Sequence, residues 1–161
     1  MYDRFAAPGE EFTRVADPES SLTLSFRNPS ISADGLRVAF VRKDGNDHQI
    51  YVFDAIDDTT SLVSQNNAGQ AANSFTRSPS ISPDGLGVTF ASEATNLVPG
   101  LSGPRIYVRS LASDTTTTPC AFFGGCMQSA LSDSRVVLSG GFPDGIDHMQ
   151  IRTYDRFTSE Y

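Results

Sequence analysis

The chain has 161 residues, 12 of them basic and 19 acidic, so its formal net charge is −7 at pH 7. An acidic chain repels phosphate backbones, which argues against nucleic acid as a partner. There is no apolar run of the roughly 18 residues that a membrane-spanning helix needs, and the first residues lack the basic and apolar regions of a signal peptide.

Residues 1–16 are predicted to form an outer strand without a sheet of its own. Tyr2-Asp-Arg-Phe5 returns near the other end of the chain as Tyr154-Asp-Arg-Phe157, and residues 11–16 alternate like a β-strand. We therefore expect residues 1–16 to act as a latch that completes the last structural unit. A segment cut from a longer chain in the middle of a unit would produce the same pattern.

The main feature of the sequence is a repeat. Asn28-Pro-Ser-Ile-Ser-Ala-Asp-Gly-Leu-Arg-Val-Ala-Phe40 returns 50 residues later as Ser78-Pro-Ser-Ile-Ser-Pro-Asp-Gly-Leu-Gly-Val-Thr-Phe90, and a degenerate third copy covers 129–138. Repeats of this length indicate units that must stack on each other to bury their apolar faces.

Each repeat is predicted to fold into short antiparallel strands joined by tight turns, which is the composition of a propeller blade. The predicted blades cover residues 28–65, 78–120 and 126–160. Strands are expected at 29–32, 37–42, 49–54 and 59–64, then at 80–82, 87–91, 105–109 and 115–120, and finally at 127–131, 135–139 and 149–155. The fold class is therefore all-β, and the third blade lacks its fourth strand.

Two sets of equivalent residues are assigned structural roles. Asp34, Asp84 and Asp133 lie in the turn between the first and second strands, where an Asp and a preceding Ser can accept hydrogen bonds from backbone N–H groups. Tyr51, Tyr107 and Tyr154 fall at nearly the same place in each third strand, and we expect them to pack between blades.

Four segments of the sequence resemble TolB-type, WD-repeat-like β-propeller repeats. They are Pro79-Ser-Ile-Ser-Pro-Asp-Gly85, Val88-Thr-Phe-Ala-Ser92, Asn96-Leu-Val-Pro-Gly100 and Ile106-Tyr-Val108. The resemblance covers about residues 1–160, although Ser134 replaces the turn glycine in the third repeat. Repeats of this type occur in periplasmic scaffolds, in secreted proteins and in propellers beside peptidase domains. The resemblance therefore slightly favours a secreted or periplasmic location for this chain.

Three blades cannot close a ring, because propellers use four to eight. Each open end of the arc would expose apolar residues over several hundred Å2, which at about 25 cal/mol per Å2 strongly favours association. We expect a homodimer in which two chains join head to tail into a six-bladed ring.

A second repeated motif could bind metal. Asp44-Gly-Asn-Asp47-His48 and Asp144-Gly-Ile-Asp147-His148 lie between the second and third strands of their blades. Asp44, Asp47, His48, Asp144, Asp147 and His148 carry side chains that can bind calcium or a transition metal. Asp-Gly is also the strongest hairpin turn signal, so the motif also fits two structural turns. No other cofactor is expected.

The two cysteines, Cys120 and Cys126, flank a glycine-containing stretch. Their spacing permits a small disulfide loop in an oxidising compartment, and it equally fits two thiols beside a turn.

No catalytic motif accompanies these repeats. The favoured function is a non-catalytic binding or scaffold module that recognises a protein or a small ligand on the face built from the loops between second and third strands. One alternative is a fragment or partner of a propeller enzyme, a hydrolase or lyase with a site in the central channel. Another is a purely structural half-propeller that assembles into a ring.

Overall fold

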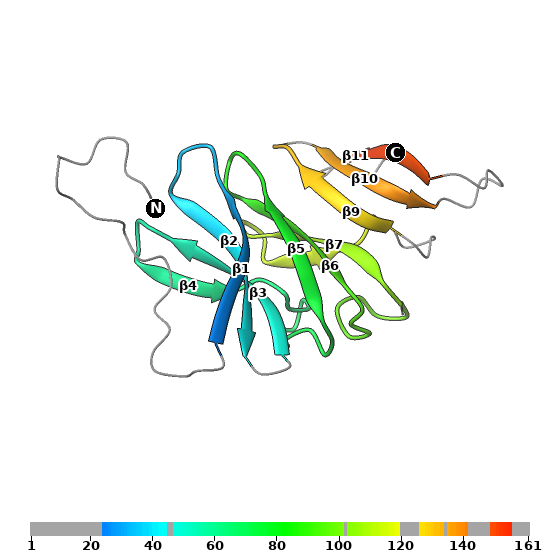
Figure 1. Ribbon diagram of the computed structural model, residues 1–161, viewed down its shortest axis with the longest axis horizontal. Helices are drawn as coiled ribbons and strands as arrows, with labels where there is room; N and C mark the ends of the chain where they lie inside the picture. Colours follow the sequence, from blue (N-terminus) through cyan, green and yellow to red (C-terminus); the bar gives the residue numbers. More distant parts are fainter. Residues whose placement is uncertain are drawn as a thin grey trace.

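The computed structural model describes residues 24–44, 47–101, 103–119, 126–133, 135–141 and 149–155. These residues form eleven β-strands in three antiparallel sheets, which stand side by side like the blades of a fan (Figure 1). None of the described residues belongs to an α-helix, and so the described part of the chain contains no helix that could cross a membrane. The predicted all-β blade architecture is confirmed.

The first two sheets each have four strands in sequence order. The first consists of β1 (Leu24–Ile31), β2 (Arg37–Asp44), β3 (Asp47–Asp54) and β4 (Thr59–Leu62). The second consists of β5 (Thr76–Ile81), β6 (Gly87–Ser92), β7 (Arg105–Ser110) and β8 (Thr115–Thr117). The fourth strands are shorter than the sequence suggests, and the first strands begin earlier.

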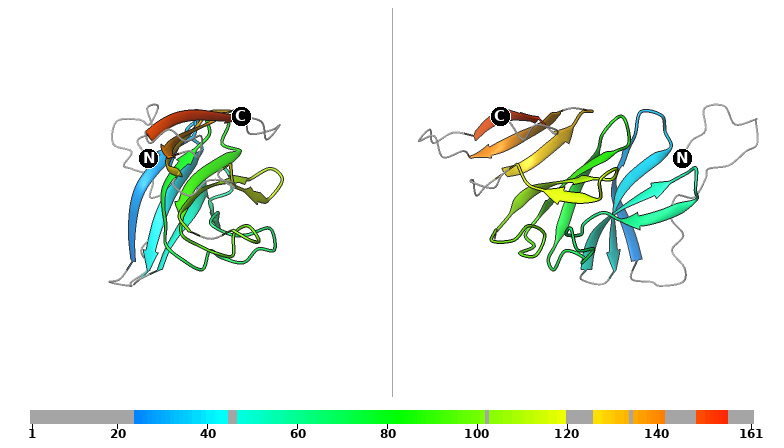
Figure 2. Two further views of the ribbon diagram at one scale, coloured as in Figure 1. Left: turned by 90° about the vertical axis from the view of Figure 1, so that its right-hand side faces the viewer. Right: turned by 180° about the vertical axis from the view of Figure 1, so that it is seen from behind.

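The third sheet has three described strands in the order β11-β10-β9. They are β9 (Cys126–Leu131), β10 (Arg135–Gly141) and β11 (Met149–Asp155). Seen from behind, the three sheets splay apart as an arc, with the third sheet at the opposite end from β4 (Figure 2). The latch predicted for residues 1–16 lies outside the described residues.

A bulge explains why the first strands of the first two blades are longer than predicted. The pairing of β1 with β2 shifts between Arg27 and Ser30, and that of β5 with β6 shifts between Arg77 and Ser80. The residue before each proline takes a left-handed conformation, with φ of 52° at Asn28 and 53° at Ser78. The strand therefore continues through the proline instead of starting there.

The turns between first and second strands form as predicted in the first two blades. Ser32 donates to Asp34 at 2.5 Å, and the same carboxylate accepts the N–H of Leu36 at 2.9 Å. In the second blade Asp84 likewise accepts from the Ser82 hydroxyl and from the backbone N–H two residues on. Asp133 acts between blades instead, because it accepts the N–H of Asp84 at 2.8 Å.

The largest core lies between the first two sheets. Tyr107 and Phe90 of the second blade are fully buried there, with their rings stacked 5.8 Å apart. The core also contains alternating residues of β2, β3, β6 and neighbouring segments: Ala39, Val41, Ile50, Val52, Val63, Ala72, Ile81, Val88, Ala94 and Leu97. The prediction that Tyr107 packs between blades is confirmed.

A smaller core joins the second and third blades. Ala91, Ile106 and Val108 of the second sheet pack against Val136 and Leu138 of β10. These positions alternate with the residues that face the first blade, so both faces of the second sheet are buried. The second blade thus shows the environment that a blade has inside a propeller.

Candidate functional site

The structure describes half of the predicted metal motifs. Asp47 and His48 begin β3, and the structure describes Asp44 only as a backbone position at the end of β2. Asp144, Asp147 and His148 lie outside the described residues. One of the two loops can therefore be analysed.

Asp47 and His48 make contacts that do not require a metal. The carboxylate of Asp47 accepts the side-chain amide of Gln49 at 3.0 Å, and the imidazole of His48 lies 4.3 Å from the ring of Phe75. Within the described ranges, no group of three or more His, Cys, Asp or Glu side chains could hold a metal ion. A metal site that uses both loops stays a prediction.

His48 instead belongs to a cluster of basic and aromatic side chains. It pairs with Lys43 across β2 and β3, and its carbonyl accepts the Thr76 hydroxyl at 2.7 Å. This bond brings the start of β5 to the loop end of the first sheet, where Phe75 is 38% exposed. The guanidinium of Arg77 also contacts Phe75, with its Cζ 5.8 Å from the ring centroid.

The charges around His48 are mainly positive. Burial lowers the pKa of His48, and the cations Lys43 and Arg27 lower it further, whereas the nearby carboxylate of Asp47 raises it. The imidazole is therefore neutral near pH 7, and the positive charge belongs to the Lys and Arg side chains. Arg77 is balanced in part by Glu93, at 3.5 Å in an exposed ion pair.

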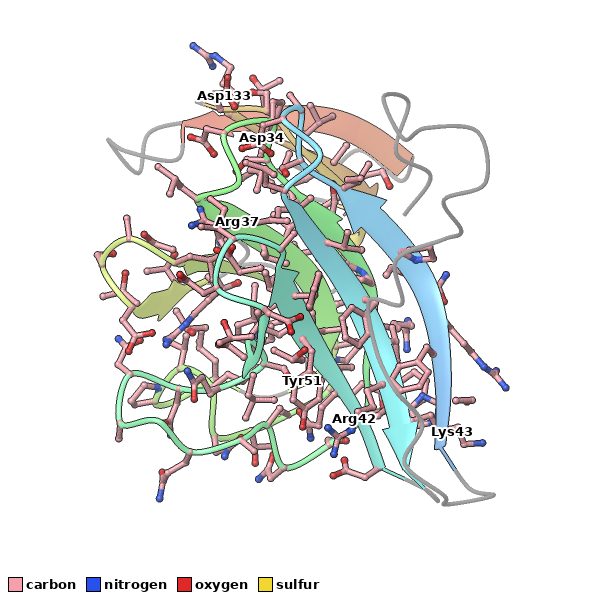
Figure 3. All side chains as sticks on the ribbon, turned by 90° about the vertical axis from the view of Figure 1, so that its left-hand side faces the viewer. Asp34, Arg37, Arg42, Lys43, Tyr51 and Asp133 are labelled. Atoms are coloured by element: carbon pink, nitrogen blue, oxygen red, sulfur yellow. The ribbon has the colours of Figure 1, made fainter. Side chains whose placement is uncertain are left out.

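We call this group of side chains the loop-face cluster; its members are Arg27, Lys43, His48, Phe75 and Arg77. It lies at the end of the sheets that carries the β2–β3 hairpin and the link into β5. Figure 3 shows Lys43 and Arg42 at this end of the first sheet, and Asp34 and Asp133 at the opposite end. The cluster can bind ligands by stacking and charge, and it contains no nucleophile paired with a base.

Sequence reasoning identified His48 and missed the other four members. Arg27 and Arg77 directly precede the two clear repeats with the same spacing of 50 residues, a signal that could have extended the repeat by one position. Phe75 gives no such signal, because only the packing of β5 against the first sheet brings it to His48. The disulfide question lies outside the described residues, since neither cysteine side chain is described.

Comparison with known proteins agrees with this architecture. A family model described as the lipoprotein LpqB β-propeller domain matches residues 6–102. Three solved structures are similar at TM-scores of 0.58, 0.57 and 0.55: TolB from Acinetobacter baumannii, the β-propeller domain of the Trilobed protease from Pyrococcus furiosus, and the acylaminoacyl peptidase from Pyrococcus horikoshii.

These structures are distant relatives in sequence. TolB is 18% identical, the Trilobed protease domain 17% and the acylaminoacyl peptidase 14%. The similarity covers 85%, 86% and 85% of this chain but only 31%, 41% and 24% of theirs. The chain thus spans less than half the length of each, and the likeness shows the fold alone. No curated protein matches the sequence.

Proposed function

Because the chain belongs to the family of lipoprotein LpqB β-propeller domains, we propose that it is a non-catalytic binding module whose three blades complete a ring by joining a second copy. The loop-face cluster is its recognition surface, as the part-exposed ring of Phe75, next to an imidazole and a guanidinium, offers a stacking site with cations close by. A protein or small ligand with acidic groups fits this surface.

The packing of Tyr51 and Phe40 on the outer face of the first blade supports the proposed association of two copies. Tyr51 and Phe40 stack 6.2 Å apart, as Tyr107 and Phe90 do in the second blade. In the second blade that face is buried against a preceding sheet. In the first blade Phe40 is also buried, at 4% exposed, and the described hydrophobic residues packed around it all come from the blade's own sheet and the residue that follows β3. The face therefore has the composition of a surface made to receive another blade.

The third blade offers the matching surface at the other end of the arc. Val136 and Leu138 are buried against the second blade, while Val137 between them points the other way and is 36% exposed. In a ring of two copies, this far face would meet the first blade of the partner copy. Each junction would then bury apolar area from both sides.

Light scattering tests the association. We expect the chain to have about twice its own mass of 17.3 kDa in solution, and Val137→Glu to reduce that mass to a single copy, because the variant places a charge in the junction. Ile56→Glu is the matched control, since Ile56 is 68% exposed and is not among the residues packed around Phe40. A 17.3 kDa mass for the unmodified chain would contradict ring closure by a second copy.

A second candidate is a propeller domain that serves a peptidase, because two of the similar structures are a protease propeller and a peptidase. In that case a catalytic centre would lie in the central channel. Fluorogenic aminoacyl and peptide substrates distinguish the candidates: a binding module leaves them intact, and hydrolysis by this chain would favour the enzyme.

A further inference from the structure

A cleft of about 420 Å3 lies between the first two blades, at the end of the sheets opposite the loop-face cluster. Its walls come from β3, β4 and the turn after β3 on one side, and from the end of β7 and the turn after it on the other. The lining residues are Arg37, Val52, Asp54, Asp57, Thr59, Ser61, Leu62, Gln65, Leu86, Arg109, Leu111 and Asp114.

One wall holds a buried cation that is already paired. Arg109 is only 1% exposed, and its guanidinium binds the carboxylate of Asp114 and the hydroxyl of Thr116, the latter at 3.1 Å. Thr116 donates in turn to the carbonyl of Gln65 at 2.5 Å, which ties the second blade to the chain leaving β4. These bonds fix the wall in place before any ligand arrives.

The other cation of the cleft is also neutralised. The guanidinium of Arg37 binds Asp54 at 2.8 Å and donates to the carbonyl of Gly85 at 3.2 Å. This bond is the main reason that the pKa of Asp54 is lowered. With both guanidinium groups paired, the carboxylate of Asp57 remains at the cleft, and no described side chain forms an ion pair with it.

The surface around the cleft is acidic as well. The turns at this end of the sheets carry Asp34, Asp58, Asp84 and Asp133 in addition to the carboxylates of the cleft itself. Opposite charges nearby raise the local concentration of a cationic ligand and hold it once bound. Because carboxylates outnumber guanidinium groups in the cleft, an anionic ligand is disfavoured.

Of the seven uncharged lining residues, Thr59, Ser61 and Gln65 are polar and the other four are apolar. Val52, Leu62, Leu86 and Leu111 form the apolar parts of the walls, and Leu86 is 40% exposed. A compact metal ion would gain nothing from such walls, and the described carboxylates do not converge into a metal-binding group. Lysine and arginine side chains combine an aliphatic stem with a cationic end, so they match both parts of the lining.

We propose that this cleft binds the arginine or lysine side chain of a partner polypeptide. The stem lies between Leu62 and Leu111, and the cationic end meets Asp57 and the exposed carboxylate of Asp114. This site is distinct from the loop-face cluster and from the outer faces of the first and third blades, so it does not depend on the proposed ring closure.

Chemical-shift mapping of the whole chain with small probes tests the proposal. Nα-acetyl-arginine amide and Nα-acetyl-lysine amide should shift the amides of residues lining the cleft, whereas the neutral isostere Nα-acetyl-citrulline amide should bind at least several times more weakly. We expect Asp57→Asn to weaken binding of the cationic probes by about 1.4- to fivefold, the range for one exposed charge pair. Ser61→Phe should abolish binding by filling the cleft.

Asp58→Asn is the matched control, because it removes the same charge from the same turn at a residue that does not line the cleft. Binding to this variant should weaken much less than binding to Asp57→Asn, because Asp58 adds only to the general acidic field around the cleft. Equal losses in both Asn variants would mean that general attraction to an acidic surface explains the binding, and would overturn the proposal. Shifts away from the cleft, equal binding of the citrulline probe, or no binding of either cation would overturn it too.

Discussion

At the scale of single residues, the pair between Arg109 and Asp114 is the one whose partners differ most in exposure among the ion pairs of the described residues. The Arg109 side chain is 2% exposed, whereas that of Asp114 is 81% exposed. Asp114→Asn keeps a residue type that tolerates the φ of 55° there, but leaves a buried cation without its counter-charge. We expect a loss of about 1–3 kcal/mol in the free energy of unfolding, measured by urea denaturation.

Two comparisons give this prediction its controls. Arg109→Met removes the buried charge and leaves Asp114 in water, so it should cost less than Asp114→Asn. Asp58 occupies the equivalent turn of the first blade with φ of 52°, and no described residue forms an ion pair with it. Asp58→Asn should therefore stay within about 0.5 kcal/mol of the unmodified chain. Equal losses at positions 58 and 114 would refute the role of the pair.

At the scale of elements, the repeated Asp-Gly turns provide an internal comparison. Gly35 and Gly85 have φ of 75° and 69°, so alanine is strained at either by about 1–2 kcal/mol. A Cβ at Gly35 would meet nothing within 4 Å, whereas at Gly85 it would lie 3.2 Å from Cδ of Arg37. Thermal unfolding should show Gly85→Ala as the more destabilising variant. A lower melting temperature for Gly35→Ala would contradict this explanation.

The sequence predicted the elements best where pattern and packing agree. The alternation of residues and the Asp-Gly turns located β2, β3, β6 and β7, because successive side chains of these strands point to opposite faces of the sheet. The fourth strands were predicted too long because, at their ends, side chains instead of backbone groups form the hydrogen bonds to the third strands. Ser64 accepts the N–H of Ile50 at 2.9 Å, and Thr118 donates to the carbonyl of Ile106 at 2.7 Å. Side-chain hydrogen bonds that replace backbone pairing in this way leave no signal in the alternation of apolar and polar residues.

The candidate site was less predictable than the fold. His48 was found because its motif repeats, although the structure surrounds it with Phe75 and cations instead of further metal ligands. The cleft between blades was not predicted at all. Its lining comes from strands and turns that are up to 77 residues apart, from Arg37 to Asp114, and only the stacking of blades brings them together.

At the scale of the whole molecule, the described parts of the blades differ in how their faces are covered. Both faces of the second sheet are buried against other blades, whereas Val137 on the outer face of β10 is 36% exposed. We expect amides of β9 and β10 to exchange with deuterium faster than those of β6 and β7, because a sheet that is packed on one face opens at lower cost. Uniform protection across the three sheets would contradict this expectation.

The bulges at Asn28 and Ser78 limit how the arc can grow. β1 and β5 are edge strands of their sheets, and each carries a proline that has no N–H to offer, next to a residue with positive φ. Together the kink and the missing donor prevent a stray strand from docking along these edges, as amyloid-like aggregation would require. Another blade can therefore join the arc by packing its face against a face of the arc. Backbone polymerisation along the edges of β1 and β5 is prevented.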